Sequence, residues 1–148
     1  MSIFSSFDIN ASGMTAQRYR MDIISENVAN ADTTRTADGT PYRRKVVTFE
    51  QRGEKVGSFS NVFGSVSKAY KGQGVRVRKV SEDTWNDMVL AYDPSHPDAD
   101  ENGYVTYPNV NIVTEMTNLI DASRSFEANA TAFNASKAIA VKGLEMGQ

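Results

Sequence analysis

Large apolar residues recur about every seven positions in two stretches at opposite ends of the chain, residues 4–31 and 112–144. This spacing places them on one side of a helix. Helices over 5–31 and 111–142 would be roughly 40 and 48 Å long at ~1.5 Å per residue, too long for a compact domain with a radius of gyration of about 15 Å. We therefore expect each stripe to need a partner, and the molecule to be elongated or part of an assembly. The two stripes consist of Phe7, Met14, Met21, Val28, Leu119, Phe126, Phe133 and Ala140.

Local signals predict where the two helices begin and end. Ser5 starts a capping-box pattern, which predicts that the first helix begins near this residue. The pattern fades into Asn, Asp and Thr residues, so we expect the chain to turn within 30–36. Either Asn109 or Asn111 can cap the second helix, and Gly143 predicts its end.

The middle of the chain is polar, rich in glycine and strand-like. Residues 44–49 and 74–80 read as strands with one exposed face, and residues 104–107 as a short third strand. Two prolines and an Asn-Gly pair predict a loop over 93–103. Residues 50–75 fit either a hairpin or a mobile loop, and the sequence leaves this choice open.

Together these patterns predict an α+β fold. Long N- and C-terminal helices pack as a coiled-coil-like pair, and a small β-rich middle domain separates them in the sequence. We expect helical parts at 1–35 and 111–148, with the basic strands and the acidic loop at 36–110. The second helix has small residues on several faces, which permits close approach by several neighbouring helices. A two-stranded coiled coil does not need this, whereas a many-helix assembly does.

Charge is unevenly distributed along a chain of net charge −2. Residues 41–80 carry ten basic and two acidic side chains, while residues 81–110 carry no basic and seven acidic ones. These blocks can face each other within the folded middle, or they can meet between neighbouring subunits and fix their register. A pI of about 5.4 argues against nucleic-acid binding.

Candidate chemistry is sparse. The chain has no cysteine, so it has neither disulfides nor thiolate metal sites. Asp98, Asp100 and Gly103 match the first half of a calcium-binding EF-hand loop, but Asn109 stands where the bidentate glutamate belongs. The one histidine, His96, lies in a proline-flanked polar loop that offers a general base no support. We therefore expect no enzyme activity, catalytic residue, cofactor or metal. A hydrolase using His96 would instead lose its activity in a His96→Ala variant.

A second function class is a soluble adaptor that binds an acidic protein or a nucleic acid through its basic middle. The residues that would form this surface are Tyr42, Arg43, Arg44, Lys45, Phe49, Lys68, Tyr70, Lys71, Arg76, Arg78 and Lys79. A solvated or partner-facing basic surface is the simpler interpretation. No basic residue precedes Arg18, and no apolar run reaches the length of a signal peptide or a membrane span. We therefore expect no cleaved secretory signal and no membrane span.

The two ends resemble the family of bacterial flagellar rod, hook and hook-associated proteins. The likeness lies in residues 7–18, 21–35 and 116–129, and segments 41–45, 93–100, 103–105 and 107–111 are most similar to those of proximal-rod members. The motif after the first stripe includes Asn27, Ala29, Asn30, Thr33 and Thr34. This likeness implies a structural subunit of the proximal rod, which forms part of the motor drive shaft.

The resemblance also implies how the protein reaches the rod and whom it meets there. It implies export through the flagellar type III secretion apparatus without signal cleavage, and assembly across the periplasm. The terminal helices would form the inner wall of a helical tube, and the partners would be other copies, other rod proteins, and ring and export-gate components. The expected subunit-interface residues are Phe7, Met14, Met21, Val28, Met116, Leu119, Phe126 and Phe133. In the isolated monomer we expect frayed helix ends, because helices need tertiary burial to persist.

Overall fold

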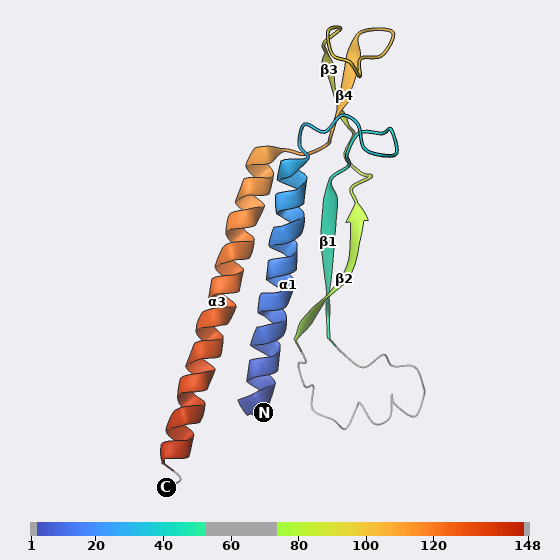
Figure 1. Cartoon of the computed structure of the whole chain (residues 1–148). Helices are drawn as coiled ribbons and strands as arrows, with labels where there is room; N and C mark the ends of the chain where they lie inside the picture. Colours follow the sequence, from blue (N-terminus) through green and yellow to red (C-terminus); the bar gives the residue numbers. More distant parts are fainter. Residues whose placement is uncertain (1–2, 53–73, 147–148) are drawn as a thin grey trace, which may run out of the picture.

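The computed structural model describes residues 3–52 and 74–146, and the molecule is elongated (Figure 1). Helix α1 spans Ile3–Ala29 and helix α3 spans Ile112–Glu145. The two helices run antiparallel side by side, and both chain ends lie at the same end of the pair (Figure 1). The expected α+β fold with a terminal helix pair is confirmed.

Two separate antiparallel hairpins form the middle. Strands β1 (Lys45–Gln51) and β2 (Val75–Glu82) pair with each other and lie along α1, on the side away from α3 (Figure 1). Strands β3 (Val89–Tyr92) and β4 (Tyr104–Tyr107) form a second hairpin beyond the end of the helix pair. Helix α1 is therefore packed on two sides, which explains why its apolar residues spread around the helix.

A β-bulge keeps the apolar residues of β2 on the side that faces α1. Val75 and Val77 are half-buried and alternate with the exposed Arg76 and Arg78. Thr48 pairs with Lys79 and Phe49 with Val77, so Arg78 is an extra residue in β2. Lys79 is therefore exposed as well, and Val80 returns to the side that faces α1. A β-bulge adds one residue to one strand and so restores the inward direction of the apolar side chains after it.

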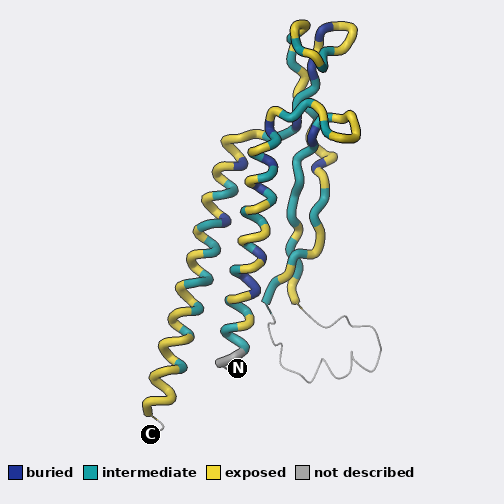
Figure 2. Tube along the Cα trace, viewed as in Figure 1, coloured by how far each residue is buried: buried dark blue, intermediate teal, exposed yellow. Residues whose placement is uncertain are grey.

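The core is small and has a polar centre. Among the described residues, the buried apolar ones are Ala16, Ile24, Ala31, Tyr42, Val105 and Ala122. Glu115 and Asn27 are fully buried, and Glu115 is the largest of the fully buried side chains. Burial is concentrated where the helices meet the hairpins and becomes sparse toward the C-terminal end of α3 (Figure 2). A buried carboxylate is costly unless it is paired, so this region has to hold its partners in place.

The predicted boundaries are confirmed, two of them to within two residues. The predicted strands correspond to β1, β2 and β4, and Asn111 caps α3 by accepting a hydrogen bond from the Thr114 amide at 3.0 Å. Helix α1 begins at Ile3, two residues before Ser5, and α3 continues through Gly143 to Glu145. An N-cap residue contributes about 1 kcal/mol, and a glycine inside a helix costs about the same. The hydrogen bonds of the additional helical residues outweigh these small terms, so both helices extend past the residues that would end them.

The other expectations for the middle have mixed outcomes. Strand β3 was not predicted, because it has only four residues and pairs with β4 across a loop. The 93–103 loop is confirmed between these strands. Most of residues 50–75 lie outside the described part of the chain, so the choice between hairpin and loop stays open. The division of the chain at residues 35 and 110 stays a prediction.

Candidate functional site

A buried polar cluster, which we call the junction, connects the helix pair to the β1–β2 hairpin. Its centre is Asn27, near the end of α1, whose side-chain amide donates to the Lys45 carbonyl and to Glu115 Oε2, both at 2.9 Å. The Asn27 Oδ1 atom accepts from the Tyr42 hydroxyl at 2.9 Å and from the Lys45 amide at 2.8 Å. All four hydrogen-bonding positions of this amide side chain are therefore filled.

Glu115, in the first turn of α3, is the second centre of the junction. Its Oε1 atom accepts from Arg44 Nη2 at 2.7 Å and Arg44 Nε at 3.0 Å. Asn118 Nδ2 lies 3.3 Å from the same oxygen. A guanidinium that donates two hydrogen bonds holds a carboxylate in both position and direction, so this pair fixes the start of α3 relative to β1.

Arg44 also connects this pair to the end of β2. Its Nη1 lies 3.3 Å from Asp83 Oδ2, and its amide donates to Asn109 Oδ1 at 2.9 Å. Burial acts to lower the pKa of Arg44, but the hydrogen bonds to Glu115 and Asp83 outweigh it and raise this pKa above its usual value. The cation therefore remains charged in the junction.

Asp83 ends β2 and ties the connection to β3 into the junction. Its carboxylate accepts from the Asn86 side chain at 2.8 Å and from the Trp85 and Asn86 amides at 3.1 and 3.3 Å. These hydrogen bonds, led by the one from the Asn86 side chain, and the contact with Arg44 hold the pKa of Asp83 below its ordinary value of 3.8 despite burial. The carboxylate form is thus the one that the folded state favours.

The rest of the predicted motif surrounds the end of α1. Asn30 donates to the Glu26 carbonyl at 2.9 Å, and Thr33 Oγ1 donates to Asn30 Oδ1 at 3.2 Å. Thr34 Oγ1 donates to Asp98 Oδ2 at 2.8 Å, while Ala29 is exposed. The motif therefore makes the turn after α1 and connects it to the loop between β3 and β4.

The predicted subunit-interface residues separate into two groups. Phe7 and Phe133 contact each other within one chain, with ring centroids 5.0 Å apart. The half-buried members of the set are Phe7, Met14, Met21, Val28, Leu119, Phe126 and Phe133. Met116 is 55% exposed on the outer side of α3. The two stripes thus partly bury each other, and Met116 belongs to a face that no described residue covers.

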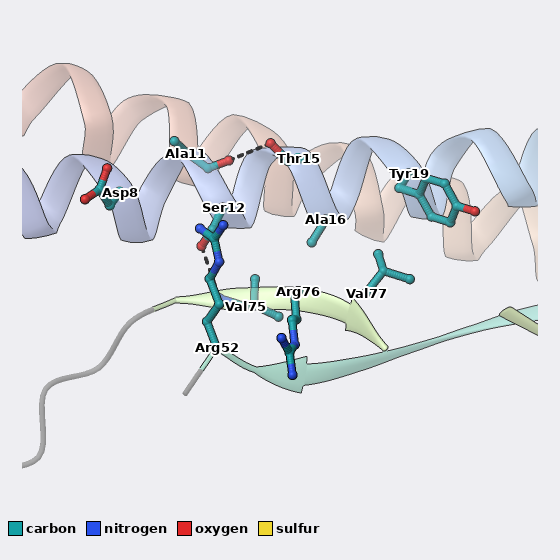
Figure 3. Close-up of a pocket in the computed structure, with 10 residues that line it drawn as sticks. All are labelled: Asp8, Ala11, Ser12, Thr15, Ala16, Tyr19, Arg52, Val75, Arg76 and Val77. Carbon is teal, nitrogen blue, oxygen red and sulfur yellow. Dashed lines mark hydrogen bonds between the residues drawn. The ribbon is translucent and has the colours of Figure 1, made fainter. Parts of the chain in front are cut away.

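Small residues bring the helices close together. A Cβ atom added to Gly13 would lie 2.5 Å from Asn129 Oδ1, so glycine permits this approach of α1 and α3. Ala122 of α3 is buried as well, whereas the buried Ala16 lines the side of α1 that faces β2. On its other side α1 faces β2 across an open hollow of about 370 Å³ (Figure 3).

The acidic block, 81–110, and the basic block, 41–80, do not simply pair with each other in the described parts of the chain. Asp100 Oδ1 accepts from the Asn102 and Tyr104 amides, and His96 Nδ1 lies 3.1 Å from the Asp98 amide. No three His, Cys, Asp or Glu side chains converge as metal ligands in the described ranges. Among described residues of the two blocks, the one ion pair that connects them is Arg44–Asp83.

The proposed nucleic-acid surface is divided in the same way. Tyr42, Arg44 and Lys45 contribute to the junction, and Lys45 also pairs with Glu26. Arg76 and Arg78 are exposed on β2, whereas Lys68, Tyr70 and Lys71 lie outside the described residues. Part of the described set is therefore engaged inside the fold, and Arg76, Arg78 and Lys79 are the members exposed on β2.

Sequence reasoning named several members of the junction, but not as one site: Tyr42, Arg44 and Lys45 were placed in a candidate basic surface, and Glu115 and Asp83 were not selected. Asn27 was named through the family motif alone. A signal did exist, because Glu115 lies between Val113 and Met116 in the first turn of the apolar helix. Its partner Asn27 is 88 positions away, which no local pattern connects.

The two ends of the chain match known sequence families. The family described as Flagella basal body rod protein matches residues 7–35. The family described as Flagellar basal body rod FlgEFG protein C-terminal matches residues 101–146. The flagellar basal-body rod protein FlgC of Bacillus subtilis is 46% identical over 154 aligned residues, which cover all of both chains. The chain belongs to the FlgC family of flagellar basal-body rod proteins.

Other FlgC relatives give the same result. The protein of Borreliella burgdorferi is 44% identical over 143 residues, covering 94% of this chain and 93% of the relative. The protein of Escherichia coli O157:H7 is 39% identical over 148 residues, covering all of both. The predicted flagellar rod family is thereby confirmed, and these names describe a rod component of the flagellar basal body.

Membership of the FlgC family gives the junction a context. Asn27 lies in the first matched segment and Glu115 in the second, and their side chains meet at 2.9 Å. The two segments that carry the family likeness are therefore joined by a buried hydrogen bond. Neither described helix of this FlgC family member is apolar enough over 18 residues to span a membrane.

Proposed function

We propose that this chain is a structural subunit of the proximal part of the flagellar rod, and that its copies assemble helically into the motor drive shaft. The observation that carries this proposal is the outer face of α3. Val113, Met116 and Ile120 follow one another at intervals of three and four, which is the spacing of one helix face. They are 75%, 55% and 53% exposed, although they lie in the same turns of α3 as the fully buried Glu115.

An exposed apolar helix face beside a rigid junction is suited to a neighbouring helix. Farther along the same face, small residues follow at Ala128, Ala135 and Ala138, all of them exposed. Large residues at one end and small ones at the other allow a second helix to pack closely along α3. We propose that residues 1–35 and 111–148 form the tube wall, and that the middle part, 36–110, lies outside it.

The same assignment includes the partners and the route. Other rod proteins, ring components and export-gate components are the proposed neighbours, and the proposed location spans the periplasm. Export through the flagellar secretion apparatus without cleavage predicts an N-terminus that is intact after assembly. Mass spectrometry of the protein from purified basal bodies measures this directly. A product shortened at a signal-peptide cleavage site would contradict the export proposal.

The assembly proposal is tested by placing a charge on the outer face of α3. Ile120→Lys adds one positive charge to an exposed position, so the isolated monomer should keep its helix content and thermal midpoint. Burial of that charge against a neighbouring helix is unfavourable, so cells carrying the variant should lose swimming and assembled basal bodies. Asp121→Asn is the matched control, because it changes the net charge by the same amount at an exposed neighbouring position.

The result depends on where the variant chain is found. Circular dichroism first establishes that both monomers are folded. Immunoblots of purified basal bodies then measure incorporation, with Asp121→Asn expected at the normal level. Normal incorporation of Ile120→Lys would overturn the proposal that this face is a subunit interface.

A further inference from the structure

The β3–β4 hairpin has one covered face and one open face. Register pairs Ala91 with Val105 and Tyr92 with Tyr104, so neighbouring pairs point to opposite sides of this two-stranded sheet. Val105 is completely buried, and the His96 ring lies 6.3 Å from that of Tyr107 on the same side. This side is therefore covered around Val105 and Tyr107, whereas Val89 at its far end is 54% exposed.

The other side exposes large apolar groups. Leu90, Tyr92 and Tyr104 share it, and we call these three residues the open face. Leu90 and Tyr92 are each 67% exposed and Tyr104 is 46% exposed. The Tyr92 and Tyr104 rings pack edge to face with centroids 5.3 Å apart, so they form a fixed aromatic surface. A two-stranded hairpin is marginally stable by itself, which favours a partner over this face.

The charges around the open face restrict the chemistry of that partner. Arg35 of the same chain reaches this region and pairs with Asp98 at 3.4 Å. The exposed carboxylates of Asp87, Asp100 and Glu101 form no ion pair with a described residue, and residues 81–110 contain no lysine or arginine. Exposed tyrosines surrounded by acidic groups match a surface that presents arginine, because a guanidinium stacks on aromatic rings and pairs with carboxylates. The expected partner surface is therefore an arginine-bearing one.

The chain itself carries such a surface on the outer side of β2. Arg76 and Val77 leave β2 on opposite sides, with Val77 toward α1 (Figure 3). Arg76 and Arg78 share the single carboxylate of Glu50, at 2.5 and 3.8 Å, and their side chains are 46% and 68% exposed. One carboxylate for two guanidinium groups leaves this strand face positively charged.

The two surfaces are displaced along the length of the molecule. The β3–β4 hairpin projects beyond the helix pair, whereas β2 lies beside α1 along the helix pair (Figure 1). Within one chain the Arg76 and Arg78 side chains are paired with Glu50 and not with the hairpin. A second copy shifted along the long axis would bring its β2 next to this hairpin.

We propose that the open face of one copy docks on the Arg76–Arg78 face of β2 in a second copy. This contact joins two different surfaces, so it repeats without closing and propagates along an axis. The inference rests on the proposed function, because it assigns one of the contacts by which copies meet in the rod. Charge complementarity fixes which ends meet, and the aromatic rings provide the area that is buried.

Cysteine cross-linking tests this contact cleanly, because the chain has no cysteine of its own. Glu101→Cys and Lys79→Cys place thiols beside the two surfaces at exposed positions that stand outside the proposed core of the contact. A chain carrying both changes should form a ladder of multimers when basal bodies are oxidised, and each single variant should form none. The control combines Lys79→Cys with Thr114→Cys, which is exposed on α3, and should form no ladder.

The outcomes separate this inference from the proposed function. Incorporation of the double variant without a ladder overturns the docking contact and leaves the rod assignment intact. If the double variant is absent from basal bodies, the purified chain is oxidised at high concentration, where a ladder supports docking and its absence overturns it. A product that joins one copy to a different protein also overturns docking between copies. Adding Tyr92→Ser to the double variant should reduce the ladder about tenfold.

Discussion

Removal of the Asn27 side chain should strongly destabilise the protein. Asn27→Ala eliminates four hydrogen bonds, two donated and two accepted, at 2.8 to 2.9 Å. Each contributes about 1 kcal/mol net, and the better helix propensity of alanine returns about 0.5 kcal/mol. We therefore expect a loss of about 3–4 kcal/mol in the free energy of unfolding, a large fraction of the roughly 10 kcal/mol typical of a protein.

Equilibrium urea unfolding followed by circular dichroism at 222 nm measures this loss. With a slope of about 2 kcal/mol per molar urea, the midpoint should fall by nearly 2 M. Asn134→Ala is the matched control, because Asn134 is exposed on a helix and its loss should change the midpoint little. A midpoint shift below about 0.5 M for Asn27→Ala, which corresponds to ~1 kcal/mol, would show that the junction does not hold the fold together.

Three further predictions follow from the structure. Burial, and then the nearby charges of glutamates, raise the pKa of Tyr42 to about 12. The folded state therefore favours the neutral phenol. The contribution of Tyr42 to the stability of the fold is complete below pH 10 and is lost as the pH rises from 10 through 12. Tyr42→Phe should remove the last tyrosinate component of an absorbance titration at 295 nm. Gly74 has a φ of +90°, and an added Cβ would lie 2.1 Å from Ser12 Oγ, so Gly74→Ala should lower the thermal midpoint. At Gly143 in α3 an added Cβ atom would have no other atom within 4 Å, so Gly143→Ala should raise or preserve that midpoint. Equal effects of the two changes would contradict the prediction that Gly74 is required by its backbone conformation and by Ser12. In the dilute monomer, amides of the exposed segment 141–146 should exchange hydrogen fastest in α3, and strong protection there would contradict the expected fraying.

Local patterns predicted those elements whose stabilising contacts are local. The seven-residue spacing identified both helices, and the sequence narrowed the cap of α3 to Asn109 or Asn111, of which the structure selects Asn111. The alternation of valine and arginine identified β2, although the bulge after Arg78 interrupts it. Strand β3 has no such pattern, because Leu90 and Tyr92 are exposed and only pairing with β4 defines it.

The junction could not be predicted in this way because its members come from four distant places. The Arg44–Glu115 hydrogen bonds span 71 positions, and the Asn27–Glu115 hydrogen bond spans 88. Each residue alone is polar and by composition belongs on the surface. Only the folded arrangement converts them into a satisfied buried cluster, so the sequence could point to single members such as Asn27 and Arg44 but not to their meeting.

A buried polar junction suits a subunit that must present several faces in fixed directions. An apolar cluster of the same volume would often be as stable or more so, because buried ion pairs are costly to desolvate. Apolar contacts are not directional, however, whereas the Arg44–Glu115 pair and the four hydrogen bonds of Asn27 each fix an angle. Met116 directly follows Glu115, so the atoms that fix the start of α3 also fix where its exposed outer face points relative to the hairpins. In the assembly proposed above, an error in that angle would multiply from copy to copy, and we propose this as the reason for a carboxylate at the centre of so small a core.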